Sequence, residues 1–513
     1  MKLINLIKVL YKIRLFTPRS LYNLLTVLIK SGSNLMTLLY FAEKKYGERV
    51  ALVDDKETLT YTQMLNQTEN LSLHLKEQYD IEKGDKVLFL CKNHNSLIRG
   101  IFAVSRLGAD VYLVNAEIAE NQLEELLKQQ QQFKLLIYDQ EVESIITHSS
   151  FKGEKLLTYH IENSIEQLIH LNHDKELLER CSMGRLVLQT GWTTGRSKEA
   201  VHKPSLFNYL NPFIALIKRL KLLDYHTAYV GTPIYHGYGI AILLLFIPLG
   251  KKIVVSSDFE SKQASHIIAK HQVEFMTVVP LMLQRLLKTD LDNIKNLKCI
   301  ASGGTKLNEK LVNETFDQLG PVLYNLYGTS ETGLNLIATP TELNDSPMTN
   351  GQPVNKQQIK IFDQHMNEVN TGEIGQIFII NDWSMINRQK RWMGTGDLAY
   401  RDERGYYYVC GRVDDMIVSG GENVYPIHVE QELNRHPHVK DVAVIGRDDH
   451  EFGHRLHAFV TVQENISEQE ILNWLSTRVA RYQMPKQITI MDTLPYTHLG
   501  KISKKELTRG VSK

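Results

Sequence analysis

The chain has 513 residues, of which 43% are hydrophobic, and its 59 basic and 58 acidic side chains leave a net charge of +1. Because a chain of this length exceeds a single ordinary core, we expect a soluble multidomain protein. The balanced charge, without a basic patch interleaved with aromatic residues, argues against nucleic acid as a partner. The cysteines lie far apart without metal-ligand spacing, which predicts free thiols in a reducing cytoplasm: Cys91, Cys181, Cys299 and Cys410.

The first thirty residues are basic and amphipathic. No acidic residue precedes Glu43, and the basic ones are Lys2, Lys8, Lys12, Arg14, Arg19 and Lys30. Two apolar helical faces are predicted on either side of Pro18, formed by Leu3, Leu6, Ile7 and Leu10 and then by Leu21, Leu24, Leu25 and Leu28. Such a helix suits an anionic membrane surface, and packing on the protein's own body is the alternative. We predict an N-terminal extension over residues 1–35, with peripheral contact to the inner membrane face through residues 1–30 as a hypothesis.

The middle of the chain alternates between strand-like and helix-like patterns. From Val50 to about Ile300, short apolar runs are followed by helical periodicity, which predicts α/β layers with largely parallel sheets. The longest apolar run, residues 240–249, is too short to span a bilayer and predicts a buried helix. From Lys356 onward, shorter strands with turn signals predict a small antiparallel, barrel-like subdomain. Beyond Arg412, a final block has strands and helices of its own.

A loop of hydroxyls, glycines and a lysine follows the strand-like run Leu186–Leu188. Glycines let the backbone approach an anion, threonine hydroxyls add donors, and the lysine adds positive charge. The loop predicts a site for a nucleoside triphosphate, with a polar surface turn as the alternative. It is not the Walker pattern, because no Gly-Lys-Ser/Thr closes it. The candidate phosphate ligands are Thr190, Gly191, Thr193, Thr194, Gly195 and Lys198.

Further motifs follow this loop in a fixed order: PIYHGYG at 233–239, NLYGTSE at 325–331, TGD at 395–397, GRVDD at 411–415 and LPYTHLGKI at 494–502. The ordered set resembles the adenylate-forming superfamily of acyl-CoA synthetases, luciferases and peptide-synthetase adenylation domains. The resemblance covers nearly everything from Ala42 to Leu507. It implies an AMP-binding N-terminal domain over residues 36–411, a mobile C-terminal domain with the catalytic lysine over 412–513, and an active site between them.

The predicted fold class is therefore α/β. The large N-terminal domain is expected to contain two layered α/β sheets plus the barrel-like subdomain, and the small, mobile C-terminal domain is expected to be α+β.

The resemblance also assigns residues to the nucleotide. Glu331 is expected to bind Mg²⁺, with Thr194 as a second ligand, because Mg²⁺ is usually held by one or two carboxylates plus phosphate oxygens. Asp397 is expected to accept hydrogen bonds from both ribose hydroxyls, and Arg412, also a catalytic candidate, to reach the ribose or a phosphate. Tyr327 is expected to stack on adenine, with core packing as the alternative. The other candidate ligands are Gly303, Gly304, Thr305, Gly328 and Ser330.

Catalysis is assigned to the C-terminal domain. In the family, a lysine at the position of Lys501 stands between the carboxylate substrate and the α-phosphate, where a point cation offsets their repulsion. The alternative is a solvated lysine in a basic tail with Lys504 and Lys505. Asp414 matches the family's hinge. Gly420 and Gly421 resemble the loop that forms the pantetheine tunnel of CoA ligases, which favours coenzyme A as the acceptor.

The segment around His236 indicates which class of acid is activated. Amino-acid-activating relatives place an aspartate near this position, and here Tyr235, His236 and Gly237 offer no acid for a buried ammonium group, so an amino acid is not expected. His236 is a catalytic candidate, with a core histidine as the alternative.

We therefore predict an AMP-forming acid–thiol ligase that uses ATP, Mg²⁺ and coenzyme A to convert a carboxylic acid, in our interpretation a fatty acid of lipid metabolism, into acyl-AMP and then acyl-CoA. One alternative loads the acyl group onto a carrier-protein thiol. Another is a degenerate, non-catalytic acyl- or membrane-binding relative, because Trp192, Ser197 and Glu199 depart from the usual phosphate loop. The sequence leaves chain length and oligomeric state open.

Overall fold

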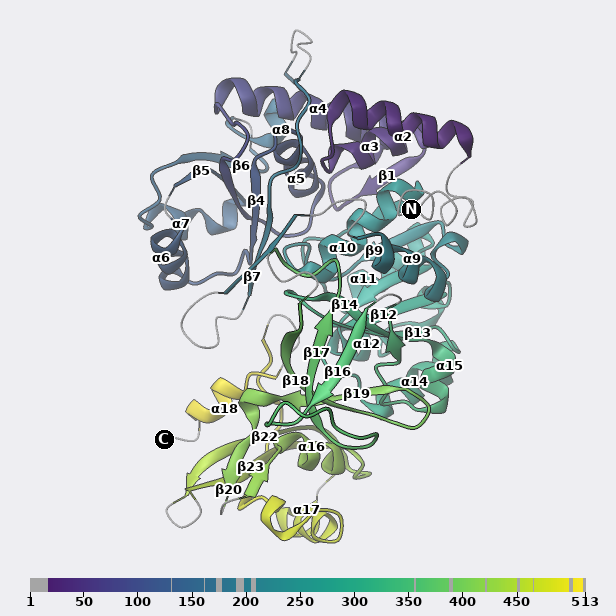
Figure 1. Ribbon diagram of the computed structural model, residues 1–513, viewed down its shortest axis with the longest axis vertical. Helices are drawn as coiled ribbons and strands as arrows, with labels where there is room; N and C mark the ends of the chain where they lie inside the picture. The colour runs from purple at the N-terminus through teal and green to yellow at the C-terminus, as the bar shows by residue number, and fades with distance from the viewer. Residues whose placement is uncertain are drawn as a thin grey trace.

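The structure, a computed structural model, describes residues 17–130, 132–160, 162–171, 178–190, 198–203, 209–354, 357–386, 391–419, 422–449, 453–464, 466–497 and 502–510. Two large mixed sheets occupy the upper part of the molecule in Figure 1, and a small C-terminal domain forms its lower end. A four-stranded antiparallel sheet lies near the centre, between these parts.

The larger sheet has nine strands in the order β15-β14-β13-β12-β11-β9-β10-β1-β2. Its neighbours from β13 to β1 are parallel, and β14, β15 and β2 run antiparallel to their neighbours. The parallel strands are short apolar runs, as expected where both faces of a sheet are covered. The strands are β1 Val50–Val53, β2 Thr58–Thr60, β9 Thr227–Val230, β10 Lys252–Val254, β11 Phe275–Val278, β12 Cys299–Gly303, β13 Leu323–Thr329, β14 Gly333–Ala338 and β15 Gln352–Pro353.

The second sheet has six strands in the order β6-β5-β3-β4-β7-β8. All neighbours are parallel except β7 and β8, which form an antiparallel pair around the predicted phosphate loop. The strands are β3 Lys86–Leu90, β4 Asp110–Val114, β5 Phe133–Tyr138, β6 Glu154–Leu157, β7 Leu186–Thr190 and β8 Lys198–His202. The predicted α/β layers with largely parallel sheets are confirmed.

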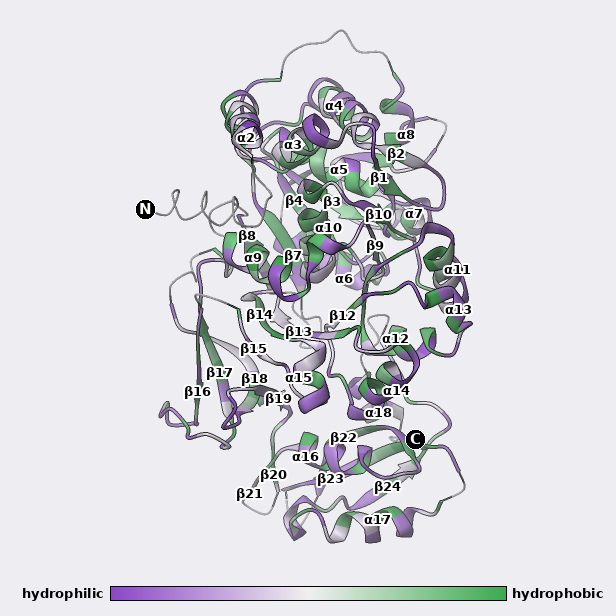
Figure 2. Cartoon of the chain, turned by 90° about the vertical axis from the view of Figure 1, so that its right-hand side faces the viewer, coloured by the Kyte–Doolittle hydropathy of each residue, from purple (hydrophilic) through white to green (hydrophobic). Residues whose placement is uncertain are grey.

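Helices cover both sheets and fill the space between them. One apolar cluster joins strands of both sheets to the helices that lie between them, namely α3 Met36–Tyr46, α4 Tyr61–Gln78, α5 Asn95–Arg106 and α10 Gly237–Phe246. Figure 2 shows hydrophobic residues gathered around α5, α10 and β1. A second cluster packs the nine-stranded sheet against α11 Ser261–His271, α12 Pro280–Leu286, α13 Leu291–Ile294 and α14 Glu309–Leu319. A third packs the six-stranded sheet against α6 Glu120–Gln129 and α7 Glu143–Thr147.

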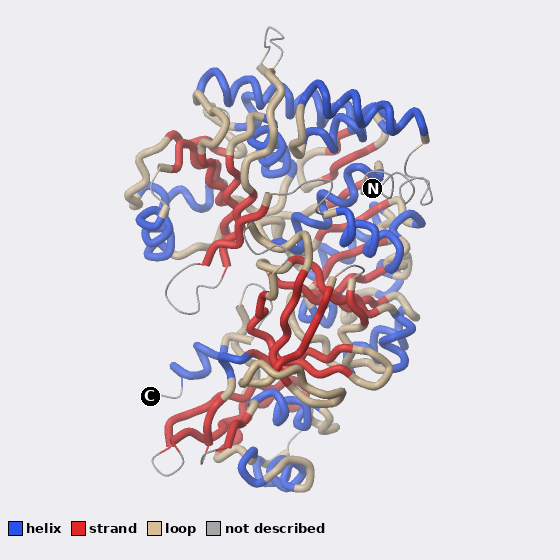
Figure 3. The backbone as a smooth tube through the Cα atoms, viewed as in Figure 1, coloured by secondary structure: helices blue, strands red, loops and turns tan. Residues whose placement is uncertain are grey.

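The remaining helices of the N-terminal domain lie at its surface. They are α2 Pro18–Ser31, α8 Ile165–Leu168, α9 Leu210–Arg219 and α15 Pro340–Asp345. The blue tubes of α2, α3 and α4 run together across the top of Figure 3, and the contacts of α3 with both of the other helices agree with this view. The predicted buried helix after His236 is confirmed, since most residues of α10 and all three of the 3-10 turn that follows it, Ile247–Leu249, are buried. Within the described ranges, the helices are too short or too polar to cross a bilayer.

The predicted antiparallel subdomain is a sheet of β16 Gln358–Phe362, β17 Gly375–Ile380, β18 Met393–Arg401 and β19 Tyr407–Arg412. Its apolar face packs on Leu336 of β14, so the subdomain shares a small core with the nine-stranded sheet. A backbone bridge between Gly351 and Tyr407 adds a second connection. The sheet is therefore fixed beside the end of β13.

The C-terminal domain is α+β, as predicted. After the 3-10 turn Val413–Asp415, its sheet has the order β21-β20-β23-β22, and β24 pairs with β23. Its strands are β20 Ile417–Ser419, β21 Glu422–Val424, β22 Val439–Asp449, β23 Gly453–Val462 and β24 Gln487–Ile490. One face packs on α16 Pro426–Asn434 and α17 Glu468–Ser476, and the other on residues near α18 Lys504–Gly510.

Candidate active site

Three polar side chains meet where β13 approaches the antiparallel sheet. Tyr327 lies near the end of β13, Asp397 lies in β18, and Arg412 ends β19. Tyr327 Oη donates a hydrogen bond to Asp397 Oδ2 at 2.6 Å, and Arg412 Nη1 donates to Asp397 Oδ1 at 3.2 Å. The register of β18 and β19 places Asp397 opposite Arg412. Each carboxylate oxygen therefore accepts a hydrogen bond, which is also what binding of a ribose diol requires.

The protonation states of this network follow from its surroundings. Burial is the main reason why the pKa of Tyr327 is raised well above its usual value, and the charge of Asp397 raises it further. Burial opposes the charge of Arg412, but attraction by Asp397 and Asp414 outweighs it and raises the pKa of the guanidinium. Neutral Tyr327 and cationic Arg412 therefore both donate to the carboxylate of Asp397, a residue that is only 9% exposed.

The predicted glycine-rich turn, residues 302–305, lies beside Tyr327. Strands β12 and β13 are parallel neighbours, and their register places Gly303 opposite Leu326. Gly304 has a φ of +81°, a backbone conformation that a side chain would strain. Thr305 follows it directly, half-buried. The turn and the three-residue network therefore occupy adjoining positions, as expected for a site that binds both base and ribose.

Tyr238 connects this turn to the His236 motif, and our sequence analysis did not single it out. Its Oη donates to the Ala301 carbonyl at 2.7 Å. A Cβ at Gly303 would lie 3.3 Å from the Tyr238 ring, so a glycine allows this close approach. Its position within the motif at 233–239 was the sequence feature that could have identified Tyr238.

His236 stands at the start of α10, half-buried, with its ring 4.5 Å from that of Tyr235. The loop before it is held by Asn93, which lies three residues beyond β3 and is buried. Asn93 Nδ2 donates to the Thr232 carbonyl at 3.0 Å, and its Oδ1 accepts the Ile234 N–H at 2.8 Å. Asn93 thus satisfies a donor and an acceptor of the loop that leads to His236. The sequence-based prediction also missed Asn93, although a polar residue shortly after a buried strand was a usable signal.

Ser330 and Glu331 lie in the tight connection from β13 to β14. His202 Nε2 donates to the Ser330 carbonyl at 2.6 Å, and Tyr209 Oη donates to His202 Nδ1 at 2.7 Å. Burial lowers the pKa of His202, against the opposing effects of the Ser330 carbonyl and Glu331, so the ring is neutral at neutral pH. Because His202 ends β8, this contact brings the predicted Mg²⁺ ligand Glu331 close to the strand that leaves the phosphate loop.

Gly328 shapes the same connection. The register of β13 and β14 shifts between Tyr327 and Gly328. A Cβ at Gly328 would lie 2.5 Å from the Gly333 carbonyl oxygen, so only glycine fits without movement of the backbone. Gly328 therefore allows the close approach of β13 and β14 just before Glu331.

The phosphate loop itself is described only at its base. Thr190 and Lys198 form the last pair of the β7–β8 ladder, while their side chains lie outside the described part. The predicted ligands Gly191, Thr193, Thr194 and Gly195, and the departures Trp192 and Ser197, also lie outside it. Glu199 is described, and its Oε1 accepts a hydrogen bond from Gln189 Nε2 at 3.1 Å. Glu199, the acidic residue that departs from the usual phosphate loop, is therefore hydrogen-bonded across the hairpin to the side-chain amide of Gln189.

The predicted catalytic lysine, Lys501, and the two predicted tunnel glycines, Gly420 and Gly421, fall outside the described residues. The chain on either side of Lys501 is described. Tyr496 and Ile502 form a backbone bridge, and Leu507 packs in the apolar cluster on one face of the C-terminal sheet.

Two acidic residues follow Arg412 in the 3-10 turn at the predicted hinge. Asp414 is exposed and lies 3.4 Å from Arg412 Nη2. Asp415 Oδ2 lies 3.1 Å from Lys504 Nζ, which also lies 3.3 Å from Glu430 Oε1. Burial opposes the charge of Lys504, but Glu430 and Asp415 outweigh it and raise its pKa. Our alternative for Lys501 grouped Lys504 with a solvated basic tail, and the structure instead gives Lys504 two acidic partners.

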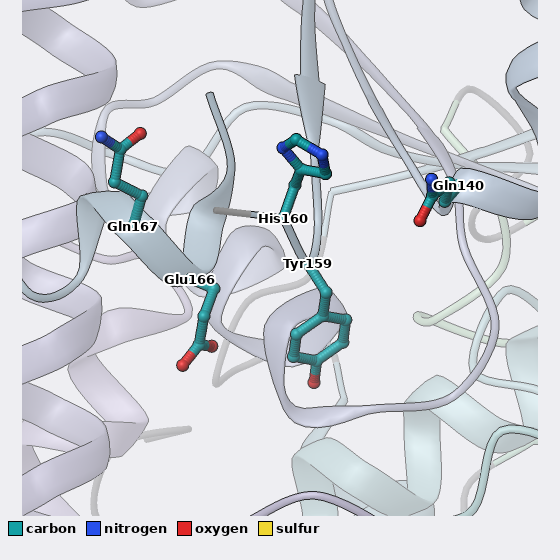
Figure 4. A pocket seen from close by; sticks show the side chains of 5 residues that line it. All are labelled: Gln140, Tyr159, His160, Glu166 and Gln167. Atoms are coloured by element: carbon teal, nitrogen blue, oxygen red, sulfur yellow. The ribbon is translucent and has the colours of Figure 1, made fainter. Parts of the chain in front are cut away.

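A surface cavity of about 580 Å³ lies away from these residues, beside β6 and α8. Figure 4 shows its lining side chains, which are Gln140, Tyr159, His160, Glu166 and Gln167. The cavity includes no residue that the motifs predicted. We therefore place the candidate active site by the motif residues that meet, and not by this cavity.

A buried cluster of Cys91, His94 and Asp139 offers three potential metal ligands within 4.8 Å of one another. His94 Nδ1 accepts the Leu97 N–H at 3.0 Å, which leaves the proton on Nε2, 2.8 Å from Asp139 Oδ1. A neutral imidazole in this tautomer has no free lone pair for a metal. The cluster therefore caps α5 and is a poor metal site.

The residues at the central site fit a nucleotide. Asp397 offers paired acceptors, the 302–305 turn gives close access to backbone, and Ser302 Oγ is buried without a hydrogen-bond partner among the described residues. Glu331 is a half-buried carboxylate at the base of the phosphate hairpin, a suitable ligand for Mg²⁺. Adenine and ribose donors thus have counterparts on this chain.

Comparison with known proteins finds relatives that cover most of the chain. The 2-succinylbenzoate–CoA ligase of Bacillus subtilis (strain 168) is 26% identical over 477 residues, which cover 90% of this chain and 95% of that protein. The structure of B. subtilis o-succinylbenzoate coenzyme A synthetase with ATP and magnesium ion is similar, with a TM-score of 0.79 at 24% identity, covering 92% of this chain and 99% of the other. ATP-bound MatB from Rhodopseudomonas palustris gives a TM-score of 0.80 at 21% identity, covering 93% and 99%.

Two family profiles match the sequence directly. The profile of the AMP-binding enzyme C-terminal domain matches residues 428–501. The profile of the AMP-binding enzyme matches residues 40–386, more than half of the chain, and so this protein belongs to the AMP-binding enzyme family and carries the family's C-terminal domain.

Proposed function

We propose that this protein is an ATP-dependent carboxylate–CoA ligase, which forms an acyl-adenylate with release of pyrophosphate and then acyl-CoA with release of AMP. The observation that carries the proposal is the Tyr327–Asp397–Arg412 network beside the 302–305 turn. Family membership and the CoA-ligase names of the relatives support it.

In the first half-reaction, a carboxylate oxygen bonds to the α-phosphorus while the bond to pyrophosphate breaks. Two anions must approach each other, so the chain has to supply cations and oriented donors. Lys501 places a positive charge between the carboxylate and the α-phosphate. Thr190, Gly191, Thr193, Gly195 and Lys198 hold the other phosphates through hydroxyl, backbone and ammonium groups. Mg²⁺, when held by Glu331 and Thr194, supplies further positive charge to the phosphate oxygens.

The nucleoside is held by the central network and the turn. Asp397 accepts hydrogen bonds from the ribose hydroxyls, and Arg412 remains within reach of ribose or phosphate. Tyr327 offers its ring to adenine, and Gly303, Gly304, Thr305, Gly328 and Ser330 line the approach to the base.

In the second half-reaction, the thiol of coenzyme A attacks the acyl carbon, loses its proton, and AMP leaves. The N-terminal domain, residues 36–411, and the C-terminal domain, residues 412–513, change their relative orientation about Asp414, which withdraws Lys501. Gly420 and Gly421 then let the pantetheine arm pass close to the backbone.

For the acid we propose a fatty or related carboxylic acid. The Tyr235–His236–Gly237 segment offers no carboxylate for an ammonium group, which disfavours amino acids. His236, at the start of the apolar helix α10, is proposed to contact the acyl group or the reacting carboxylate. A carrier-protein thiol is the alternative acceptor, and the degenerate relative is disfavoured because the network at Asp397 is intact.

Carboxylate-dependent ATP–pyrophosphate exchange tests the proposal. The panel should contain saturated fatty acids of increasing length, 2-succinylbenzoate and amino acids, followed by addition of coenzyme A or a carrier protein. We expect exchange with an apolar acid and AMP release with coenzyme A. Exchange limited to amino acids would overturn the substrate class, and a lack of exchange with any acid would overturn the reaction.

We also propose a cytoplasmic location in which the basic N-terminal extension contacts the inner membrane face. The support is the charge of this extension, because no acidic residue precedes Glu43. Segments rich in lysine and arginine are attracted to the anionic headgroups of a membrane surface. The basic residues of the extension are Lys2, Lys8, Lys12, Arg14, Arg19 and Lys30.

A further inference from the structure

Helix α2 carries an apolar face that is exposed in the described part of the structure. Tyr22, Leu25 and Ile29 are 69%, 48% and 68% exposed. Their spacing of three and four residues places them on one side of the helix. Such a row of large apolar side chains is unfavourable in water unless something covers it.

The opposite side of α2 is the one that packs on the protein. Val27, Ser20 and Ser31 are buried, and Leu24 and Leu28 are half-buried. Our sequence analysis assigned Leu25 to the same apolar face as Leu24 and Leu28. The structure divides that set, because Leu25 is exposed to solvent together with Tyr22 and Ile29.

The helix is fixed firmly to the body of the enzyme. Asn34 Nδ2 donates to the carbonyls of both Ser31 and Cys181 at 2.9 Å. Gly32, with a φ of +85°, lies so close to Cys181 that a Cβ would be 2.1 Å from its carbonyl oxygen. Met183 N–H donates to the Ser33 carbonyl at 2.8 Å. Segment 181–183 leads directly into β7, so α2 is attached to the strand that enters the phosphate loop.

The charge around this face indicates what covers it. Arg19 and Lys30 are exposed near the two ends of the helix, and the sixteen residues before Thr17 add Lys2, Lys8, Lys12 and Arg14 without an acidic residue. Positive charge around large apolar side chains matches the surface of a bilayer that contains anionic lipids. The AMP-binding profile matches residues 40–386, so α2 lies before the matched region.

We propose that the Tyr22–Leu25–Ile29 face of α2 inserts into an anionic bilayer surface and, because α2 is fixed to segment 181–183, holds the enzyme in one orientation on the membrane. The inference rests on the proposed membrane location and is independent of the proposed reaction. Figure 1 shows α2 at the edge of the upper part of the molecule.

Vesicle co-sedimentation of the full chain tests the proposal. The vesicles are phosphatidylcholine alone or phosphatidylcholine mixed with phosphatidylglycerol. We expect binding to the mixed vesicles that weakens with added salt, and little binding to phosphatidylcholine alone. The combined variant Tyr22→Ser, Leu25→Ser, Ile29→Ser should bind at least about tenfold more weakly, because its apolar burial is lost.

A matched control replaces exposed apolar residues elsewhere. Met366→Ser with Tyr482→Ser removes side chains that are 57% and 46% exposed, and its binding should be unchanged. Equal vesicle binding by the α2 variant and this control would overturn the proposal. Failure of the full chain to bind anionic vesicles would also overturn it. A dimer that dissociates only in the α2 variant, without vesicle binding, would also overturn it and assign the face to a second copy.

ATP–pyrophosphate exchange tests the proposed reaction separately from vesicle binding. The α2 variant should retain ATP–pyrophosphate exchange with a soluble short acid, and its thermal unfolding should match the wild type. Loss of vesicle binding with normal exchange supports the docking face. If neither protein shows exchange while vesicle binding still depends on α2, the reaction is wrong and the docking face stands.

Discussion

Lys504 Nζ lies 3.1 Å from Asp415 Oδ2, so the helix that follows Lys501 is tied to the residue that follows Asp414. Glu430, at the middle of α16, shares the same ammonium group at 3.3 Å and also accepts the Val444 N–H at 2.8 Å. The predicted hinge segment, α16 and the C-terminal helix are thus joined through one cation. A rotation at the hinge should therefore carry the Lys501 segment with it as a unit.

The first prediction concerns this cation. Lys504→Gln should slow acyl-AMP formation about fivefold, because loss of a partly buried ion pair loosens the Lys501 segment. Lys505→Gln, an exposed neighbour, is the control and should change little. Single-turnover acyl-AMP formation is the measurement, and equal rates for the two variants would contradict the role of Lys504.

The second prediction concerns the central carboxylate. Asp397→Asn should raise the KM for ATP roughly 10- to 100-fold, because a charged acceptor of ribose hydroxyls is lost. Tyr327→Phe removes only the donor to Asp397 and should give a smaller rise. Exchange kinetics at varied ATP measure both, and a larger effect of Tyr327→Phe would argue that Asp397 is mainly structural.

The third prediction separates the two half-reactions. Lys501→Ala should abolish acyl-AMP formation but preserve thioester formation from supplied acyl-AMP, because its cation is needed only where carboxylate and phosphate meet. Arg412→Gln, by contrast, should weaken nucleotide binding. Equal loss of both half-reactions in Lys501→Ala would show that the lysine has another task.

The fourth prediction concerns pH and the C-terminal domain. Burial, aided by Arg447, lowers the pKa of His457 to about 4, and its Nε2 lies 2.8 Å from Thr489 Oγ1. The unfolded chain takes up a proton near pH 6.5 and the folded domain does not, so this residue should reduce the free energy of unfolding as pH falls from about 6.5 to about 4.

His457→Gln should remove that part of the pH dependence, on the order of 2 to 3 kcal/mol at pH 4. The exposed His454→Gln is the matched control. Urea unfolding at neutral and acidic pH measures the difference between the variants. An equal loss of stability in both variants on acidification would refute the assignment.

The fold was predictable because its signals are local. Alternating apolar runs and helical periodicity indicated parallel α/β layers, and the run after His236 indicated a buried helix, since each pattern depends on neighbours in sequence. The strand order was not predictable in this way. Pairings such as β1 with β10 join segments far apart in the chain, and periodicity carries no information about such partners.

The candidate site was predictable only through the resemblance. Nothing local indicates that Tyr327 would meet Asp397, because the contact depends on how the antiparallel sheet packs on β14. Asn93 and Tyr238 were missed for the same reason, since their contacts are with backbone carbonyls and amides of distant segments. The division of Leu25 from Leu24 was missed because helical periodicity does not say which edge of a wide apolar stripe the protein covers.

The two occupied oxygens of Asp397 have a thermodynamic consequence. In the proposed complex, ribose hydroxyls donate to the same two oxygens and either join or replace the hydrogen bonds from Tyr327 and Arg412, because each oxygen has two lone pairs. Without nucleotide, the buried charge of Asp397 is therefore still paired. Each of these hydrogen bonds that the ribose replaces reduces the net free energy gained on binding. When AMP departs in the proposed reaction, Tyr327 and Arg412 remain to pair with Asp397, which favours release of the product over its retention.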